Sequence, residues 1–184
     1  MRPPGPAPRA DTLRLEDHVR DVPDFPRQGI LFKDITPLLL SPAAFHAAIE
    51  RLAVLVARPE AVVGIESRGF LFGAPLALRW SVPFVPARKF GKLPGRTVRQ
   101  VYSLEYGEDT LELHADALPA GTRTVIVDDL LATGGTAHAT AQLVRQLHAE
   151  VTAALFLIEL AGLGGRERLA PLPVHALMTM RVDE

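Results

Sequence analysis

Residues 125–136 constrain the fold of this chain more than any other segment, because they join an apolar strand, two acidic residues, a turn of small residues and the start of a helix. The strand carries Asp128 and Asp129 at its carboxyl end. Backbone amides of the turn and of the helix N-terminus can converge there on one anion. The turn is made of Ala132, Thr133, Gly134, Gly135 and Thr136. The segment therefore predicts a phosphate site beside two carboxylates.

The two carboxylates narrow the choice of ligand. They would repel a phosphate unless they face sugar hydroxyls or a divalent cation, so a ligand with both a phosphate and a ribose fits the segment best. The segment has neither the lysine of a P-loop nor the glycine spacing of a dinucleotide-binding domain. The alternative interpretation is that Asp128 and Asp129 only end a strand and cap a helix.

The other apolar segments alternate between strand and helix, which predicts an α/β fold with a central, mostly parallel sheet flanked by helices on both faces. Apolar runs predict strands at 61–66, 82–87, 124–129, 151–159 and 174–180, and helical spacing predicts helices from Ser41-Pro42 onward, at 70–80 and at 136–149. A weaker helical signal covers 11–20. Two prolines favour an edge position for the strand at 82–87. Residues 101–106 and 110–114 alternate across a turn at 107–109, which predicts an inserted hairpin.

Length and composition suit one globular domain over residues 11–184, preceded by a flexible, proline-rich tail at 1–10. A formal net charge of −1 supplies no general attraction for nucleic acid or for an anionic membrane. The absence of cysteine excludes disulfides and thiolate metal sites. The six histidines lack the spacing of a zinc site. With no apolar run long enough for a membrane span or a signal peptide, we expect a cytoplasmic protein.

The basic residues are concentrated in one stretch. Residues 67–104 contain no acidic residue and carry seven positive charges, so the rest of the chain carries −8. Arg88, Lys89 and Lys92 lie in a glycine-punctuated loop that can close over a polyanion. We expect Arg79 and Arg99 to be ordinary solvated charges.

Residues 125–136 resemble the phosphoribosyl-diphosphate (PRPP) motif of the type I phosphoribosyltransferases. Four more segments are similar, in the same order, to the adenine phosphoribosyltransferase family, and they lie at 25–39, 66–73, 88–95 and 102–107. The resemblance covers the chain from about Leu15 to its end. It implies the type I phosphoribosyltransferase fold with the hairpin as a hood. It also implies transfer of ribose 5-phosphate from PRPP to N9 of adenine, giving AMP and pyrophosphate in purine salvage.

The resemblance also implies roles for residues around PRPP. Asp128 and Asp129 would hold the ribose hydroxyls, and residues 132–136 would wrap the 5′-phosphate. Ser67 and Arg68 would take the pyrophosphate, in a turn where this family often has a non-proline cis peptide bond. The alternative for Arg68 is an ordinary surface charge.

Further roles follow from the same resemblance. Arg88, Lys89 and Lys92 would clamp the pyrophosphate, and Glu105 would be the catalytic carboxylate beside the purine imidazole. A glutamate in a hairpin is more often exposed and inert, and only its sequence context raises Glu105 above that.

Four residues resemble the family's adenine site. Main-chain groups of Leu31 and Lys33 would read the base edge, Phe32 would stack on the ring, and Leu160 would lie on its opposite face. Lys33 stands where many members carry arginine. Ordinary core packing is the alternative for Phe32 and Leu160.

The family resemblance implies Mg²⁺, held mainly by substrate oxygens and water, and a homodimer. Two other functions compete with this interpretation. A PRPP-sensing regulator would need a recognition helix or an added domain, for which few residues are left. A sister transferase for hypoxanthine, guanine, xanthine or orotate is disfavoured by residues 25–39.

Overall fold

The computed structural model describes residues 13–103 and 107–181, which form two compact units, one ending at Arg51 and the next beginning at Leu52. The predicted tail at 1–10 and Glu105 lie outside the described residues. The prediction of a single domain over 11–184 stays a prediction. In the described part, no helix is long and apolar enough to cross a membrane.

The first unit contains a small antiparallel ribbon. Its strands are β1 (Arg20–Val22) and β2 (Phe32–Asp34), preceded by a 3-10 helix, η2 (Glu16–His18). Within the described residues 13–20, the predicted helical signal corresponds to this one turn only, and the chain from Arg20 pairs with β2 instead. Arg20 Nη2 lies 2.7 Å from Asp34 Oδ2 across the ribbon.

Asp34 also connects the ribbon to the first helix, α1 (Thr36–Leu40). Hydrogen bonds from Thr36, together with the contact from Arg20, lower the pKa of Asp34 to about 2. Helix α2 (Pro42–Ala53) then begins as predicted at Ser41-Pro42, where Ser41 Oγ accepts a hydrogen bond from the Ala44 N–H at 3.3 Å.

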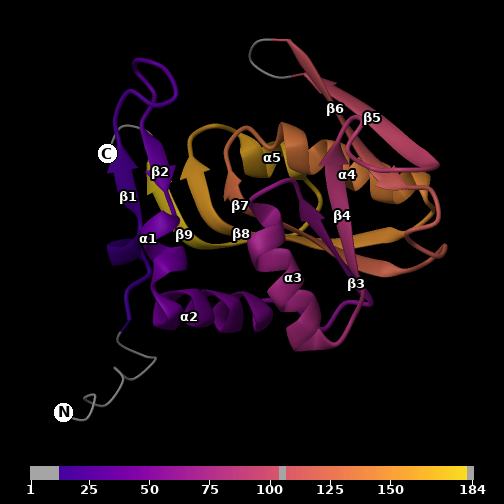
Figure 1. Ribbon diagram of the computed structural model, residues 1–184, viewed down its shortest axis with the longest axis horizontal. Helices are drawn as coiled ribbons and strands as arrows, with labels where there is room; N and C mark the ends of the chain where they lie inside the picture. Colours follow the sequence, from indigo (N-terminus) through magenta and orange to yellow (C-terminus); the bar gives the residue numbers. More distant parts are fainter. Residues whose placement is uncertain (1–12, 104–106, 182–184) are drawn as a thin grey trace. The chain divides into compact units, whose positions relative to one another are not determined.

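The second unit is built on a seven-stranded sheet with the order β5-β6-β4-β3-β7-β8-β9 (Figure 1). Its strands are β3 (Ala61–Ile65), β4 (Phe84–Lys89), β5 (Thr97–Ser103), β6 (Glu108–His114), β7 (Arg123–Leu131), β8 (Glu150–Ala161) and β9 (Val174–Arg181). The pairs among β4, β3, β7, β8 and β9 are parallel, whereas β5 and β6 form an antiparallel hairpin on β4. The predicted α/β fold with a mostly parallel sheet is confirmed.

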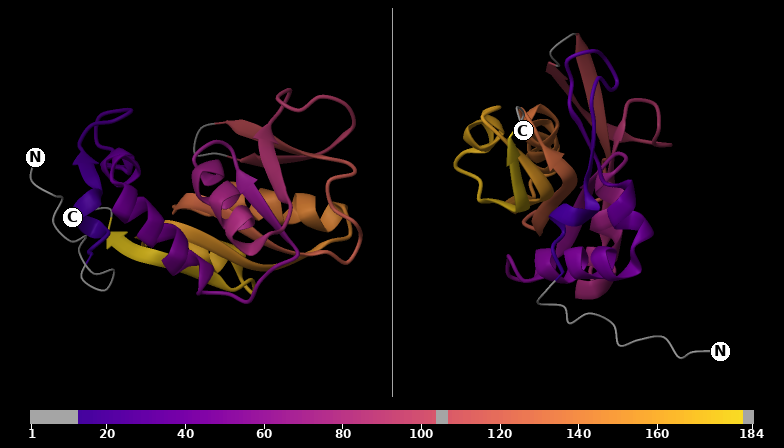
Figure 2. Two further views of the ribbon diagram at one scale, coloured as in Figure 1. Left: turned by 60° about the horizontal axis from the view of Figure 1, so that its bottom comes forward. Right: turned by 90° about the vertical axis from the view of Figure 1, so that its left-hand side faces the viewer.

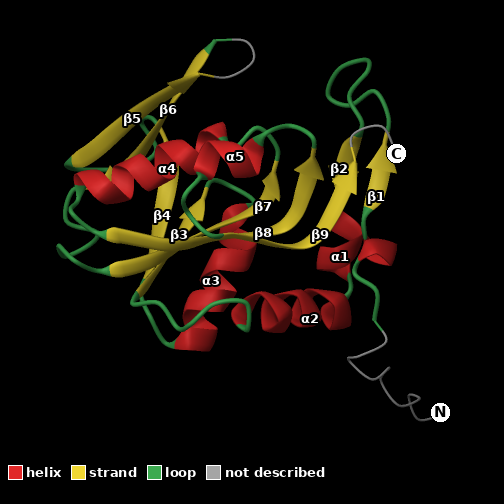
Figure 3. Cartoon of the chain, turned by 180° about the vertical axis from the view of Figure 1, so that it is seen from behind, coloured by secondary structure: helices red, strands yellow, loops and turns green. Residues whose placement is uncertain are grey.

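Helices cover both faces of this sheet. Helix α3 (Gly69–Trp80) lies on one face, while α4 (Gly135–Gln146) and the short α5 (Gly165–Leu169) lie on the other (Figures 1 and 3). The buried side of α4 carries Thr140, Leu143 and Val144, as its helical spacing predicted, and Leu147 just after the helix is buried as well. The hairpin of β5 and β6 extends the sheet past β4, at the opposite end of the sheet from β8 and β9 (Figure 2).

Two strand predictions need correction. The strand at 82–87 is not at an edge, because β4 lies between β3 and β6. The carbonyl of Ala87 accepts a hydrogen bond from the Glu66 N–H, so its neighbour Pro86 faces away from β3. Pairing with β6 begins only at Arg88, so the missing amide of Pro86 breaks no ladder.

The second correction concerns the hairpin turn. The predicted turn at 107–109 is too long, because Glu108 and Asp109 already belong to β6. Asp109 pairs with Tyr102 of β5. This pairing brings an acidic side chain next to the basic end of β4.

Close packing of α3 on the sheet depends on Gly64 in β3. A Cβ atom there would lie 2.6 Å from the Phe84 ring, closer than side-chain carbon atoms approach one another. The ring in turn packs edge-to-face on Phe70 of α3, with centroids 5.7 Å apart. The glycine therefore makes room for the aromatic pair between β3 and α3.

We predict that Gly64→Ala lowers the free energy of unfolding by about 1–3 kcal/mol, because the added methyl group overpacks this contact. Urea denaturation measures the change. The double variant Gly64→Ala with Phe84→Leu should lose less than the sum of the two single changes, since the shorter side chain leaves space for the methyl group. Strictly additive losses would contradict this explanation.

Candidate functional site

The carboxyl edge of the sheet is stepped where β3 meets β7. Pairing between the two strands ends at Gly64 and Val127, whereas β7 continues beside β8 as far as Leu131. The sequence placed the end of this strand too early, at Asp129, because the pairing that extends it comes from β8. Asp128 and Asp129 therefore lie past the last pair between β3 and β7, at an edge where open α/β sheets bind ligands.

The chain leaving β3 turns directly over these carboxylates. The Glu66–Ser67 peptide bond is cis, as the family resemblance implied, and α3 begins at Gly69. A Cβ atom on Gly69 would lie 2.5 Å from the carbonyl oxygen of Val127 and 3.1 Å from Asp128 Oδ1. Only glycine allows this approach, so the turn with Ser67 and Arg68 is brought against the end of β7.

An ion pair connects the two sides of this step. Arg68 Nε lies 3.0 Å from Asp129 Oδ2, and the Asp129 side chain is only 4% exposed. Asp128 Oδ1 accepts a hydrogen bond from the Asp129 N–H at 2.9 Å. These contacts are consistent with the prediction that residues 67–68 and residues 125–136 share one site.

Burial raises the pKa of both carboxyl groups. For Asp128 the neighbouring charge of Asp129 raises the pKa further, and the shift carries it well above 3.8. For Asp129 the Arg68 guanidinium opposes the effect of burial but does not cancel it. These two acids are costly to ionise in the free protein, as is typical of groups retained for binding or catalysis.

The turn of small residues after β7 encloses a cavity of 90 Å³. Its lining consists of Asp128, Leu130, Leu131, Ala132, Thr133, Gly134, Gly135, Thr136 and Ala137. Gly134 has a φ of 76°, a left-handed conformation that favours glycine, and α4 begins at the next residue. Every residue of the predicted phosphate loop thus lines one cavity at a helix N-terminus, which suits an anion.

Helix α5, which the sequence did not predict, supports this loop. A Cβ atom on Gly134 would lie 2.7 Å from the Gly165 carbonyl oxygen, and one on Gly165 would lie 2.2 Å from the Ala132 carbonyl oxygen. The two backbones are therefore in direct contact. The glycines at 164 and 165 were the available signal, because a glycine pair permits such an approach.

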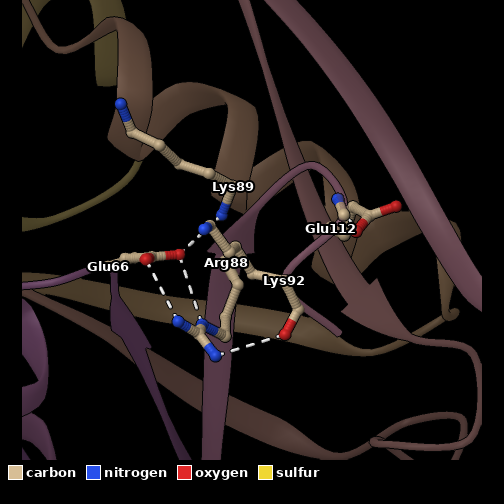
Figure 4. Close-up of polar contacts among 6 residues, drawn as sticks. Glu66, Arg88, Lys89, Lys92 and Glu112 are labelled. Carbon is tan, nitrogen blue, oxygen red and sulfur yellow. Dashed lines mark hydrogen bonds and ion pairs between the residues drawn. The ribbon is translucent and has the colours of Figure 1, made fainter. Parts of the chain in front are cut away.

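The prediction that Arg88, Lys89 and Lys92 all lie in a loop needs correction, because Arg88 and Lys89 are the last residues of β4 and only Lys92 lies in the loop that follows, here called the basic loop. This part of the chain is held by a carboxylate that sequence reasoning did not select. Glu66 accepts hydrogen bonds from Arg88 Nε and Nη2 at 3.3 and 3.2 Å, and from the Lys89 backbone N–H at 2.8 Å (Figure 4). Arg88 Nη1 donates to the Lys92 carbonyl oxygen at 3.2 Å. Burial opposes ionisation of Glu66, but these contacts lower its pKa. Groups of all three predicted clamp residues therefore belong to one hydrogen-bonded network around Glu66.

A second carboxylate organises the far side of the same loop. Glu112 is 1% exposed and accepts hydrogen bonds from the Gly91 N–H at 2.9 Å and from Arg99 Nε at 2.8 Å. Arg99 also lies over the ring of Phe90, 4.5 Å from its centroid. The expectation that Arg99 is an ordinary solvated charge was therefore wrong, because it pairs with a buried acid.

The residues predicted to bind a base are divided between the two units. In the first unit, Phe32 packs edge-to-face on Phe25 with centroids 5.1 Å apart. Lys33 Nζ lies 2.9 Å from Asp21 Oδ1, and its side chain is 5% exposed. Leu31 precedes β2, and Leu160 lies near the end of β8 in the second unit. Their predicted contacts with a base remain predictions.

Comparisons with known proteins agree with this geometry. The family model described as "Phosphoribosyl transferase domain" matches residues 39–169. An adenine phosphoribosyltransferase of Synechococcus sp. (strain JA-3-3Ab) is 59% identical over 176 residues, covering 94% of this chain and 99% of that protein.

Solved structures show the same relationship. The adenine phosphoribosyltransferase of Thermoanaerobacter pseudethanolicus superimposes with a TM-score of 0.87 at 49% identity, covering 91% of this chain and 100% of that one. The Saccharomyces cerevisiae enzyme, solved with adenine and an imino-altritol bisphosphate, gives a TM-score of 0.84 at 44% identity, covering 89% and 96%.

We predict that Asp128→Asn increases the free energy of unfolding by about 1 kcal/mol at pH 8, because it removes a charge that the folded protein disfavours. The sign follows from the raised pKa. Both folded and unfolded protein hold the proton well below pH 3.8, and the loss of stability grows as the pH rises from 3.8 towards the higher folded pKa of Asp128, above which it is complete.

Denaturation curves at pH 4.5 and pH 8 measure how much the free energy of unfolding of Asp128→Asn exceeds that of the parent. The gain should be larger at pH 8. The matched control is Asp116→Asn, on an exposed turn after β6, which should show no pH-dependent gain. An equal gain for Asp128→Asn at both pH values would contradict the assignment.

Proposed function

We propose that the stepped edge of the sheet is the PRPP site of an adenine phosphoribosyltransferase, because this chain belongs to that family. The enzyme is a pentosyltransferase of purine salvage. It transfers the ribose 5-phosphate group of PRPP to N9 of adenine and gives AMP and pyrophosphate. The observation that carries the site assignment is the phosphate-sized cavity that Asp128 and the loop after β7 line together.

PRPP would bind along the step between β3 and β7. Asp128 and Asp129 would accept hydrogen bonds from the ribose hydroxyls, and backbone amides of residues 132–136 would hold the 5′-phosphate. This division is supported by the lining of the cavity, which Asp128 shares with all five residues of the loop. The ligand would thus present hydroxyls to the acids and phosphate to the helix.

Pyrophosphate would occupy the other side of the step, near Ser67 and Arg68. Arg68 reaches this position from the turn before α3, Arg88 and Lys89 end β4, and Lys92 lies in the loop after it. As pyrophosphate departs, positive charge develops at the anomeric carbon and negative charge grows on the leaving group. Cations fixed beside the leaving group stabilise that charge more than they stabilise intact PRPP.

Mg²⁺ fits these residues as a substrate-held ion. Among the described residues, no group of three or more His, Cys, Asp and Glu side chains gathers into a metal site. Asp128 offers a carboxylate oxygen beside the ribose position, which suits a hard cation that keeps most of its water. When bound, Mg²⁺ would neutralise charge on the pyrophosphate group and help it leave.

Adenine would bind to the four residues that the family resemblance implies. Backbone groups of Leu31 and Lys33 would read its edge, with Phe32 and Leu160 on its faces. The engagement of the Lys33 ammonium by Asp21 supports a main-chain role for Lys33, because that side chain already has an ionic partner. Glu105 would manage the proton near the purine imidazole.

A homodimer is part of the same proposal. An apolar stripe on α3 supports it: Leu71 is 40% exposed and Leu78, two helical turns on, is 81% exposed. A second copy of this chain that covers the stripe would remove this apolar surface from water. The cytoplasmic location predicted from the sequence stays a prediction.

Initial rates of pyrophosphate release test the reaction and its base. With PRPP and Mg²⁺ present, adenine should support turnover, whereas hypoxanthine, guanine, xanthine and orotate should give rates at least about a hundredfold lower. A faster rate with another base would make the chain a sister transferase. PRPP binding with no turnover on any base would favour the sensor instead.

We predict that Glu105→Gln lowers kcat by about a hundredfold or more, since a general acid or base contributes that much to a proton transfer. The KM for PRPP should change little, because no part of PRPP is assigned to this side chain. Steady-state kinetics with adenine measure both constants. Glu108→Gln, three residues further along the same hairpin, is the control and should keep the parental kcat. Unchanged turnover in Glu105→Gln would exclude the catalytic role.

A further inference from the structure

Asp109 occupies a junction that the proposed function leaves unexplained. Its Oδ2 atom lies 3.1 Å from Lys89 Nζ of β4 and accepts a hydrogen bond from the Tyr102 hydroxyl of β5 at 3.4 Å. Its Oδ1 atom accepts the Thr110 N–H at 2.8 Å. Asp109 therefore contacts a predicted clamp cation, Lys89, and a hydroxyl on the paired strand of the hairpin, that of Tyr102.

The two members of the ion pair differ in their freedom to move. The Lys89 side chain is 58% exposed, whereas the Asp109 side chain is 22% exposed and is also held by Tyr102 and Thr110. The lysine can turn toward an anion in solvent, but the carboxylate cannot follow it. An anion that binds Lys89 must therefore share this cation with a fixed negative charge.

Both groups are charged at neutral pH. Burial opposes ionisation of Asp109, yet hydrogen bonds from Thr110 and Lys89 lower its pKa. The hydrogen bond and the charge of Asp109 raise the pKa of Lys89. The pair as a whole is thus close to electrically neutral, although Lys89 taken alone counts as one of the predicted clamp cations.

We propose that Asp109 is a positioning residue that offsets the charge of Lys89 and so limits the affinity of the enzyme for pyrophosphate. The inference rests on the proposed function, in which Lys89 takes part in binding that product. A fully uncompensated set of cations would hold pyrophosphate after the transfer and delay its release. The fixed carboxylate keeps Lys89 available to the leaving group while reducing the net attraction for the released product.

Asp109→Asn tests the proposal because it removes the charge but keeps an acceptor oxygen of the same size for Tyr102 and Lys89. The inhibition constant for pyrophosphate, measured against PRPP, should fall about fivefold at low salt. The effect should shrink at high salt, because the lysine is exposed. A role limited to holding the hairpin in place predicts the opposite, an inhibition constant that rises.

Three further variants complete the experiment. Asp116→Asn makes the same change in net charge on the exposed turn after β6 and should leave the inhibition constant within about twofold of the parent. Lys89→Gln should raise the constant. The double variant Lys89→Gln with Asp109→Asn should lose the gain of the single Asp109 change, because the compensated cation is gone.

The outcomes separate this proposal from the function on which it rests. If Lys89→Gln weakens pyrophosphate inhibition but Asp109→Asn leaves it unchanged or weaker, charge compensation is wrong while the clamp assignment stands. If Lys89→Gln has no effect, the clamp assignment of Lys89 is wrong and the compensation falls with it. If the lower inhibition constant of Asp109→Asn persists in the double variant, its effect does not act through Lys89, and the proposal is wrong.

Discussion

A nearly buried carboxylate needs a cation beside it, and this requirement determines how the edge of the sheet is built. Asp129 lies past the last pair between β3 and β7, and Arg68 reaches it from the turn that leaves β3. Removing the arginine would leave an isolated buried charge, which costs far more than an exposed ion pair gains. The position of the turn, the start of α3 at Gly69 and the direction of the Asp pair therefore depend on one another.

The same principle operates across the basic part of the chain. Residues 67–104 carry only positive charge, yet acids just outside both ends of that stretch fold back onto it. Glu66 holds Arg88, while Asp109 and Glu112 on β6 hold Lys89 and Arg99. Charges that are separated by sign along the sequence are therefore paired with opposite charges in the folded chain. The positive charge of Arg88, Lys89 and Arg99 is therefore partly offset within the chain before any anion binds.

Much of this architecture could be predicted from the sequence. The continuous apolar runs predicted β3 and β8, and the Asp pair followed by small residues predicted the cavity at the start of α4. Features that depend on distant partners could not be predicted. The extra length of β7 comes from β8, the interior position of β4 comes from β6, and the partnership of Glu66 with Arg88 depends on the register of two strands. Helix α5 has too few residues for a periodic signal.

The central claim is that Asp128 and Asp129 form the ribose side of a PRPP site. Titration calorimetry of PRPP with Mg²⁺ into the full chain tests it most directly, with the double variant Asp128→Asn and Asp129→Asn compared with the parent and with Asp116→Asn. The account predicts that the double variant binds PRPP at least about tenfold more weakly, because each lost carboxylate weakens a charge-assisted hydrogen bond. Asp116→Asn should bind like the parent. Unaltered affinity in a double variant that remains folded would contradict the account.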